Sequence, residues 1–233
     1  MTAAKSPWMI AFGVMAVVHL ALNGADASPW DSITKCFLAP LLAVWVIQQK
    51  GPRALVVALV FCFFGDLFLE LGDSVFVVGM AAFAGAHITF IRFFVARGAV
   101  AQLRRKPLIV VVYVIAAIGM VTYVWTGLDA GLRPVIPIYA ALLVGTAATS
   151  LATDVRAGVG GALFLISDGI IALGQADRID NDATATGLAI MTFYIVSIFF
   201  LATGIVDREK ATVAAGADFD RTQRTDCWPV FPS

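Results

Sequence analysis

The sequence predicts an all-α protein, a polytopic bundle of about eight membrane-spanning helices over residues 1–206, followed by a polar tail over residues 207–233. Composition is the first reason. Apolar residues make up 60% of the chain and charged residues 14%, against about 45–50% and about 25% in a typical soluble domain. The second reason is that the apolar residues gather in long uncharged runs. A bilayer accommodates such runs because side chains that face lipid can be apolar without cost.

Eight apolar runs approach the length of about 20 residues that a helix needs to cross the hydrocarbon core. In chain order they are residues 8–24, 32–49, 53–71, 75–97, 107–126, 133–152, 158–175 and 186–206. Turn-forming residues separate them, for example Ser28-Pro29, Gly51-Pro52 and Gly72-Asp73. The connections leave little room for a soluble domain, and the polar, mixed-charge composition of the tail is typical of a disordered segment.

The first run has a second interpretation. Lys5, the apolar stretch after it and Ala25-Asp26-Ala27 together resemble a signal peptide with its cleavage site. The run is long for a signal peptide, however, and it contains His19. Retaining it also gives a consistent topology, so we interpret it as the first span.

The placement of lysine and arginine orients the bundle. Twelve of these residues fall on one side of an eight-span arrangement: Lys5, Lys50, Arg53, Arg97, Arg104, Arg105, Lys106, Arg156, Arg208, Lys210, Arg221 and Arg224. The other side holds only Arg133 and Arg178. Because positively charged loops stay in the cytoplasm, we expect both termini to be cytoplasmic and the protein to be integral to a bacterial plasma membrane. Short basic loops are routine orientation signals, so no nucleic-acid partner is expected.

Ionisable residues inside membrane spans are costly, and they are therefore the first candidates for function. Most of the polar residues in these spans lie at a similar depth, within about 12 Å of the outer surface at a rise of 1.5 Å per residue. They are His19, Lys35, Asp66, Glu70, Tyr139, Asp168 and Tyr194, with His87 somewhat deeper. This agreement in depth between separate helices predicts a polar cavity open to the outer half of the membrane.

Asp66 and Asp168 form the strongest pair, because each is surrounded by apolar residues and has no basic neighbour in sequence. The other candidates also have purely structural interpretations. His19 and His87 could be packing residues, and Lys35 could extend to the headgroups. Glu70 could lie in interfacial water, and the tyrosines could be ordinary interface aromatics.

Phe64-Gly65-Asp66-Leu67-Phe68-Leu69 contains the pattern GDxxL, and the segment from Phe76 to His87 ends in Ala-His. Both are similar to motifs of the YhhN-like lysoplasmalogenase family, and further motifs follow in the family's order on the appropriate spans. Pro134-Val135 with Tyr139 resembles its P-V-x-x-Y motif, and Gly161 to Asp168 resembles a segment that ends in Ser-Asp, which adds Ser167 to the candidates. Thr34-Lys35 is similar to its T-K-P motif, with Cys36 in place of the proline.

This resemblance implies a membrane hydrolase that cleaves the vinyl ether bond of a lysoplasmalogen-like lysolipid to a fatty aldehyde and a glycerophospho-head-group. Asp66 and Asp168 would be its active-site acids. The chemistry suits two carboxyl groups, because one can protonate the vinyl ether and the other can stabilise the cation and orient water. His87, Tyr139 and Tyr194 would position substrate or water, with His19, Glu70 and Ser167 as further binding residues. Lys35 would contact the phosphate.

Two other functions use the same residues. A proton-coupled transporter of small molecules or lipids also needs intramembrane acids. A metal-dependent membrane hydrolase could use His19, His87, Asp66 and Asp168, but their spacing matches no metal motif, so we predict neither metal nor cofactor. We expect the partners to be the lysolipid substrate and the surrounding membrane lipids.

The charge distribution makes a direct prediction about topology. A reporter domain fused after Arg208 should lie in the cytoplasm, because an even number of spans returns the chain to the side on which it starts. Protease protection or a compartment-sensitive reporter measures this. A signal from outside the cell would contradict eight spans, and cleavage after Ala27 would be one explanation for it.

Overall fold

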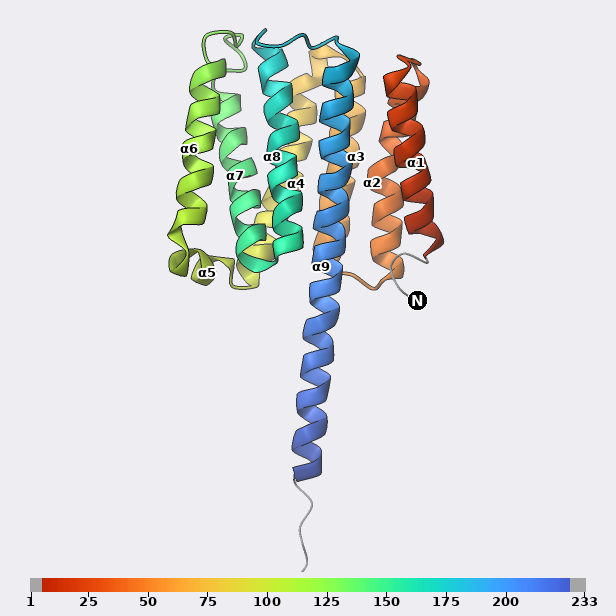
Figure 1. Ribbon diagram of the computed structural model, residues 1–233, viewed down its shortest axis with the longest axis vertical. Coiled ribbons are helices and arrows are strands. Elements are labelled where there is room, and N and C mark those ends of the chain that lie inside the picture. The colour runs from red at the N-terminus through yellow and green to blue at the C-terminus, as the bar shows by residue number, and fades with distance from the viewer. Residues whose placement is uncertain (1–5, 227–233) are drawn as a thin grey trace, which may run out of the picture.

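The computed structural model describes residues 6–226, and every regular element within them is a helix. Eight of these helices are long, and Figure 1 shows them side by side in one bundle. They are α1 (Pro7–Gly24), α2 (Trp30–Gln48), α3 (Arg53–Glu70), α4 (Phe76–Ala96), α6 (Pro107–Val124), α7 (Val135–Thr153), α8 (Val155–Gln175) and α9 (Thr184–Asp226). A 3₁₀ turn (Asp73–Val75) precedes α4, and the short helix α5 (Ala99–Arg105) joins α4 to α6. The predicted all-α bundle is confirmed.

Seven of the eight long helices are long and apolar enough to cross a membrane. The remaining one, α3, has 18 residues like α1 and α6, but it contains Arg53, Asp66 and Glu70. It packs between α2 and α4 within the bundle (Figure 1). A helix of 18–21 residues is about 27–32 Å long at 1.5 Å per residue, which matches a hydrocarbon core of about 30 Å.

The C-terminal end differs from the sequence-based expectation. We expected a disordered tail from residue 207, but α9 continues without a break to Asp226 (Figure 1). The segment contains many good helix formers and no proline, and the preceding helix removes the cost of nucleation. Residues 227–233 of the predicted tail lie outside the described residues.

Polar contacts hold α9 where it leaves the bundle. Arg97, just after α4, donates two hydrogen bonds to the Glu209 carboxylate, from Nε to Oε1 at 2.5 Å and from Nη2 to Oε2 at 2.8 Å. Arg156 on α8 donates from Nη1 to Asp207 Oδ2 at 2.6 Å. These residues belong to the end of the bundle where α1 begins (Figure 1), so both ends of the described chain lie on one side. That this side is cytoplasmic stays a prediction.

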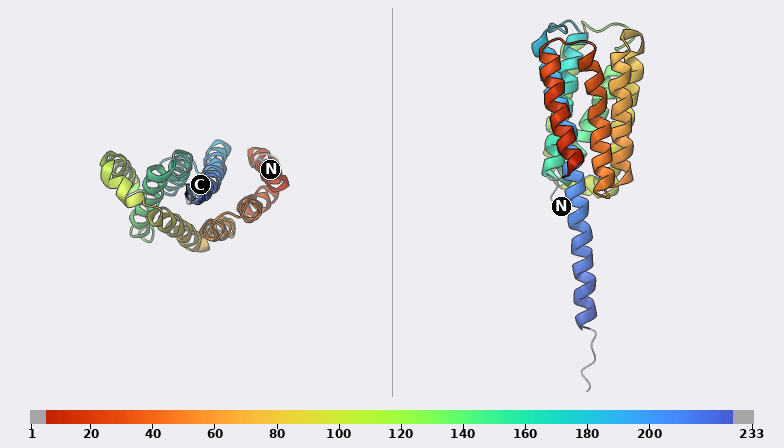
Figure 2. Two further views of the ribbon diagram at one scale, coloured as in Figure 1. Left: turned by 90° about the horizontal axis from the view of Figure 1, so that it is seen from below. Right: turned by 90° about the vertical axis from the view of Figure 1, so that its right-hand side faces the viewer.

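Viewed along the helix axes, the bundle is an arc with α6 at one tip and α1 at the other (Figure 2). Helices α8 and α9 pack closely together, and α6 packs mainly on α7. Two glycines allow close approach between helices. A Cβ atom on Gly65 would lie 2.5 Å from the Phe83 ring, and one on Gly161 would lie 2.9 Å from the Ala147 Cα. Only glycine fits at these contacts of α3 with α4 and of α8 with α7.

Candidate functional site

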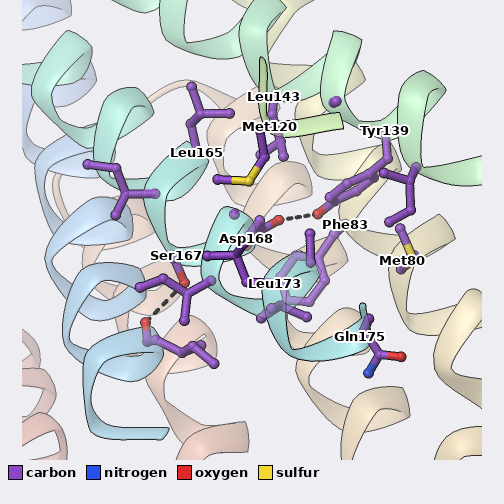
Figure 3. A pocket seen from close by; sticks show the side chains of 18 of the residues that line it. Met80, Phe83, Met120, Tyr139, Leu143, Leu165, Ser167, Asp168, Leu173 and Gln175 are labelled. Atoms are coloured by element: carbon purple, nitrogen blue, oxygen red, sulfur yellow. Dashed lines mark hydrogen bonds between the residues drawn. The ribbon is translucent and has the colours of Figure 1, made fainter. Parts of the chain in front are cut away.

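Asp66 on α3 and Asp168 on α8 line the same cavity, which has a volume of about 320 Å³. The chain brings them together because Asp66 lies near the end of α3 and Asp168 near the end of α8, at the same end of the bundle. Asp66 is fully buried, with 1% of its surface exposed, and Asp168 is partly buried. Figure 3 shows Asp168 among apolar side chains, including Met120, Leu143 and Leu165.

Each of the two carboxyl groups accepts a hydrogen bond from a tyrosine on another helix. The Tyr194 hydroxyl on α9 donates to Asp66 Oδ2 at 2.6 Å. The Tyr139 hydroxyl on α7 donates to Asp168 Oδ2 at 2.5 Å (Figure 3). Both tyrosines also line the cavity. The site therefore consists of two matching Asp–Tyr pairs that draw on four helices.

Aromatic rings connect the two pairs. The Tyr194 ring packs edge-on against Phe164 at a centroid distance of 5.5 Å, and Phe164 packs against His87 at 4.6 Å. His87 in turn packs against Tyr139 at 5.7 Å, and Phe83 contacts Tyr194 and Phe164, both at 5.9 Å. Edge-to-face contacts of this kind favour fixed ring orientations. The cluster therefore holds the two hydroxyl groups in fixed positions relative to one another.

Lys35 and Glu70 form an ion pair beside the acids. Lys35 Nζ lies 2.7 Å from Glu70 Oε1, and the side chains are 14% and 27% exposed. Lys35 lines the cavity, whereas Glu70 does not. Glu70 follows Asp66 by four residues on α3, which places both on one face of the helix. The ammonium group of Lys35 has three N–H donors, so binding Glu70 leaves donors free for a ligand.

The remaining candidates lie in different surroundings. Ser167 lines the cavity, and its hydroxyl donates to the Ile190 carbonyl at 3.0 Å. His19 and His87 are buried but are not among the residues that line the cavity. His19 Nδ1 lies 3.0 Å from the Asp31 carbonyl oxygen, between α1 and α2. We expected both histidines to line the cavity with the acids, but the structure places neither of them in its lining.

His87 instead supports the wall of the site. Its Nδ1 lies 3.1 Å from Thr146 Oγ1 on α7, and its ring packs against Tyr139 and Phe164. Sequence reasoning missed Thr146 and the packing role of Phe164. Thr146 had a detectable signal, since it is a polar residue in the middle of an apolar span. Within the part of the chain that the structure describes, no three His, Cys, Asp or Glu side chains are placed to hold a metal ion.

The arrangement suits proton transfer inside an apolar cavity. The two carboxyl groups, the two phenols and Lys35 are the titratable groups that line it, and the rest of the lining is mainly apolar. A buried carboxyl group can deliver or accept a proton, and a positioned phenol can hold it in the orientation that transfer requires. The apolar remainder of the lining fits an aliphatic ligand.

Comparison with known proteins assigns the chain to a family. The model of the YhhN family matches residues 30–205, which include both Asp–Tyr pairs and Lys35. No curated protein and no solved structure matches the chain at a significant level.

The hydrogen bonds of the two pairs predict a loss of stability when a tyrosine hydroxyl is removed. Tyr139→Phe and Tyr194→Phe each leave a carboxyl oxygen inside the cavity without its donor, and such a loss costs about 1–3 kcal/mol where the oxygen is buried. Both variants should melt at a lower temperature than the wild type in detergent. Tyr123→Phe is the control, because Tyr123 on α6 is 59% exposed, and its melting temperature should not change. If Tyr139→Phe and Tyr194→Phe melt like this control, the carboxyl groups do not depend on the tyrosines.

Proposed function

The chain belongs to the YhhN family, and we propose that it is a hydrolase of the bacterial plasma membrane that cleaves the vinyl ether bond of lysoplasmalogen-like lysolipids. The products are a fatty aldehyde and a glycerophospho-head-group. The observation that carries this proposal is that two tyrosine-bound aspartates line one largely apolar cavity. The resemblance of their motifs to those of the lysoplasmalogenases supports the same activity.

The chemistry proceeds in three steps. One carboxyl group, in its protonated form, donates its proton to the vinyl carbon that is not bonded to oxygen, and an oxocarbenium ion forms. Water attacks the carbon bonded to the ether oxygen and gives up a proton to the other, ionised carboxylate, which yields a hemiacetal. In the hemiacetal, the hydroxyl proton moves to the ether oxygen. The bond between that oxygen and the former vinyl carbon then breaks. The aldehyde and the glycerol hydroxyl are then released, with one water consumed.

The two acids would divide this work as the acids of glycosidases do, since both reactions pass through an oxocarbenium ion. The negative carboxylate stabilises the cation strongly, because the apolar lining screens charge poorly. Each tyrosine leaves one oxygen of its carboxyl group free for the reaction and fixes the direction in which it points. His87 would act on the reaction through the position of Tyr139, against which its ring packs.

Lys35 would bind the phosphate of the head-group. It lines the cavity from the second turn of α2, which begins at Trp30. Its donors that do not bind Glu70 are available to phosphate oxygens, and hydrogen bonds between charged groups are the strong ones. The lysolipid would therefore lie with its head-group toward Lys35 and its vinyl ether between the acids.

Replacement of the acids tests the proposal. Asp66→Asn and Asp168→Asn keep the size of the side chain but can neither deliver a proton nor carry a negative charge. Each should reduce aldehyde release from a lysoplasmalogen by at least about 10²-fold, because general acid–base catalysis usually contributes about 10²–10⁴-fold. The double variant should lose little more, because the residues act as a unit.

The control is Asp129→Asn, which changes an exposed aspartate between α6 and α7 and should retain full turnover. Thermal melting of each variant shows that lost activity is not lost folding. Near-normal turnover in Asp66→Asn or Asp168→Asn would contradict the proposal. Substrate flux in proteoliposomes without product release would then favour the transporter.

A further inference from the structure

Helix α6 contributes one face to the cavity although it carries no ionisable residue there. The residues of this face are Ala116, Ala117, Met120, Val121 and Val124, which recur at helical spacing. Val124 is the buried residue of α6, whereas Ala116 is exposed. Around Ala116, about halfway along α6, the inner face of the helix therefore borders open space and does not pack against protein.

The neighbouring helix α8 also lines the cavity with a residue that is exposed at the surface. Ile166 lines the cavity together with Asp168, yet 46% of its surface is exposed. The two helices approach one another near Gly169, where an added Cβ would lie 3.4 Å from the Met120 Cε. Because Ala116 and Ile166 are both cavity-lining and exposed, the cavity reaches the surface of the bundle between α6 and α8.

The opening lies at the height of the hydrocarbon core. Ala116 is in the middle of α6 (Pro107–Val124), and Ile166 is in the middle of α8 (Val155–Gln175). At this depth the membrane offers only aliphatic chains, and a charged group there is costly. The opening therefore suits the tail of a lipid and excludes its head-group.

The cavity has little depth beyond the acids. Leu165 and Leu143 line its inner end, and Leu165 precedes Asp168 by three residues, or about 4.5 Å of helix. A long aliphatic chain that starts at Asp168 does not fit into that space. A chain that turns sideways passes Ile166, two residues from Asp168, and reaches the bilayer directly.

We infer that the aliphatic chain of the substrate leaves the cavity through the seam between α6 and α8, so that the reacting bond lies at the acids while the tail stays in the bilayer. This inference rests on the proposed function. It implies that the protein tolerates long chains, because the part of the chain beyond the seam lies in lipid and not against the protein. Ala116 on one side of the seam and Ile166 on the other determine how much chain can pass.

The test closes the seam with Ala116→Phe. Its control is Ile115→Phe, at the adjacent α6 residue, which is 65% exposed and does not line the cavity. Aldehyde release is measured with two lysoplasmalogens that share a head-group and differ only in having a short or a long chain. The ratio of kcat/KM for the long chain to that for the short chain should fall at least about tenfold in Ala116→Phe, which corresponds to roughly 1.4 kcal/mol. The ratio should stay at the wild-type value in Ile115→Phe.

A binding measurement separates this inference from the proposed function. Affinity is measured for saturated alkyl-ether lysolipids with the same two chains, which have no vinyl ether to cleave. Selective loss of long-chain binding in Ala116→Phe supports the seam even if the wild type releases no aldehyde, an outcome that would overturn only the proposed reaction. Equal chain-length ratios in Ala116→Phe, Ile115→Phe and the wild type, in turnover and in binding, would overturn the seam and leave the reaction standing.

Discussion

A carboxyl group in the apolar interior of a membrane needs a hydrogen-bonding partner, because its transfer from water without one is costly. Two such groups occur here, and each finds a tyrosine on another helix. The bonds tie α3 to α9 and α8 to α7. Apolar helix surfaces select their neighbours weakly in lipid, since the lipid tails are as apolar as the helices, whereas polar contacts are specific. The positions of these four helices therefore depend on the two Asp–Tyr pairs, and the cavity lies where they meet.

The cavity has a polar side and an apolar side, and this asymmetry matches an amphiphile. Lys35 and the two acids come from α2, α3 and α8, whereas α6 supplies only apolar side chains. A lipid bound along this gradient would place its phosphate, its ether linkage and its chain next to groups of matching polarity. The aromatic cluster between the pairs also gives the site a rigid wall, which fixes the geometry that proton transfer to carbon requires.

The sequence predicted the depth of each polar residue in the membrane but not the side of its helix on which the side chain lies. Apart from the C-terminal end of α9, hydropathy located the long helices to within a few residues, and common depth brought Asp66, Asp168, Tyr139 and Tyr194 into one group. Depth does not fix the angle around a helix axis, so His19 was grouped with them although it faces Asp31 between α1 and α2. The contribution of α6 carried no signal, because its cavity-lining residues resemble those of any lipid-facing helix. The extension of α9 was missed because a polar composition indicates exposure to water and not the absence of a helix.

Isotope labelling tests most directly the central claim that the acid pair protonates carbon and directs water to the vinyl side of the ether. Turnover of a lysoplasmalogen is run in deuterated water, and separately in water labelled with heavy oxygen, with the aldehyde reduced at once to trap it. We expect one deuterium on the carbon next to the former carbonyl and no heavy oxygen in the glycerol hydroxyl. Heavy oxygen in that hydroxyl would show that water attacks the glycerol carbon, and it would contradict the proposed role of Asp66 and Asp168.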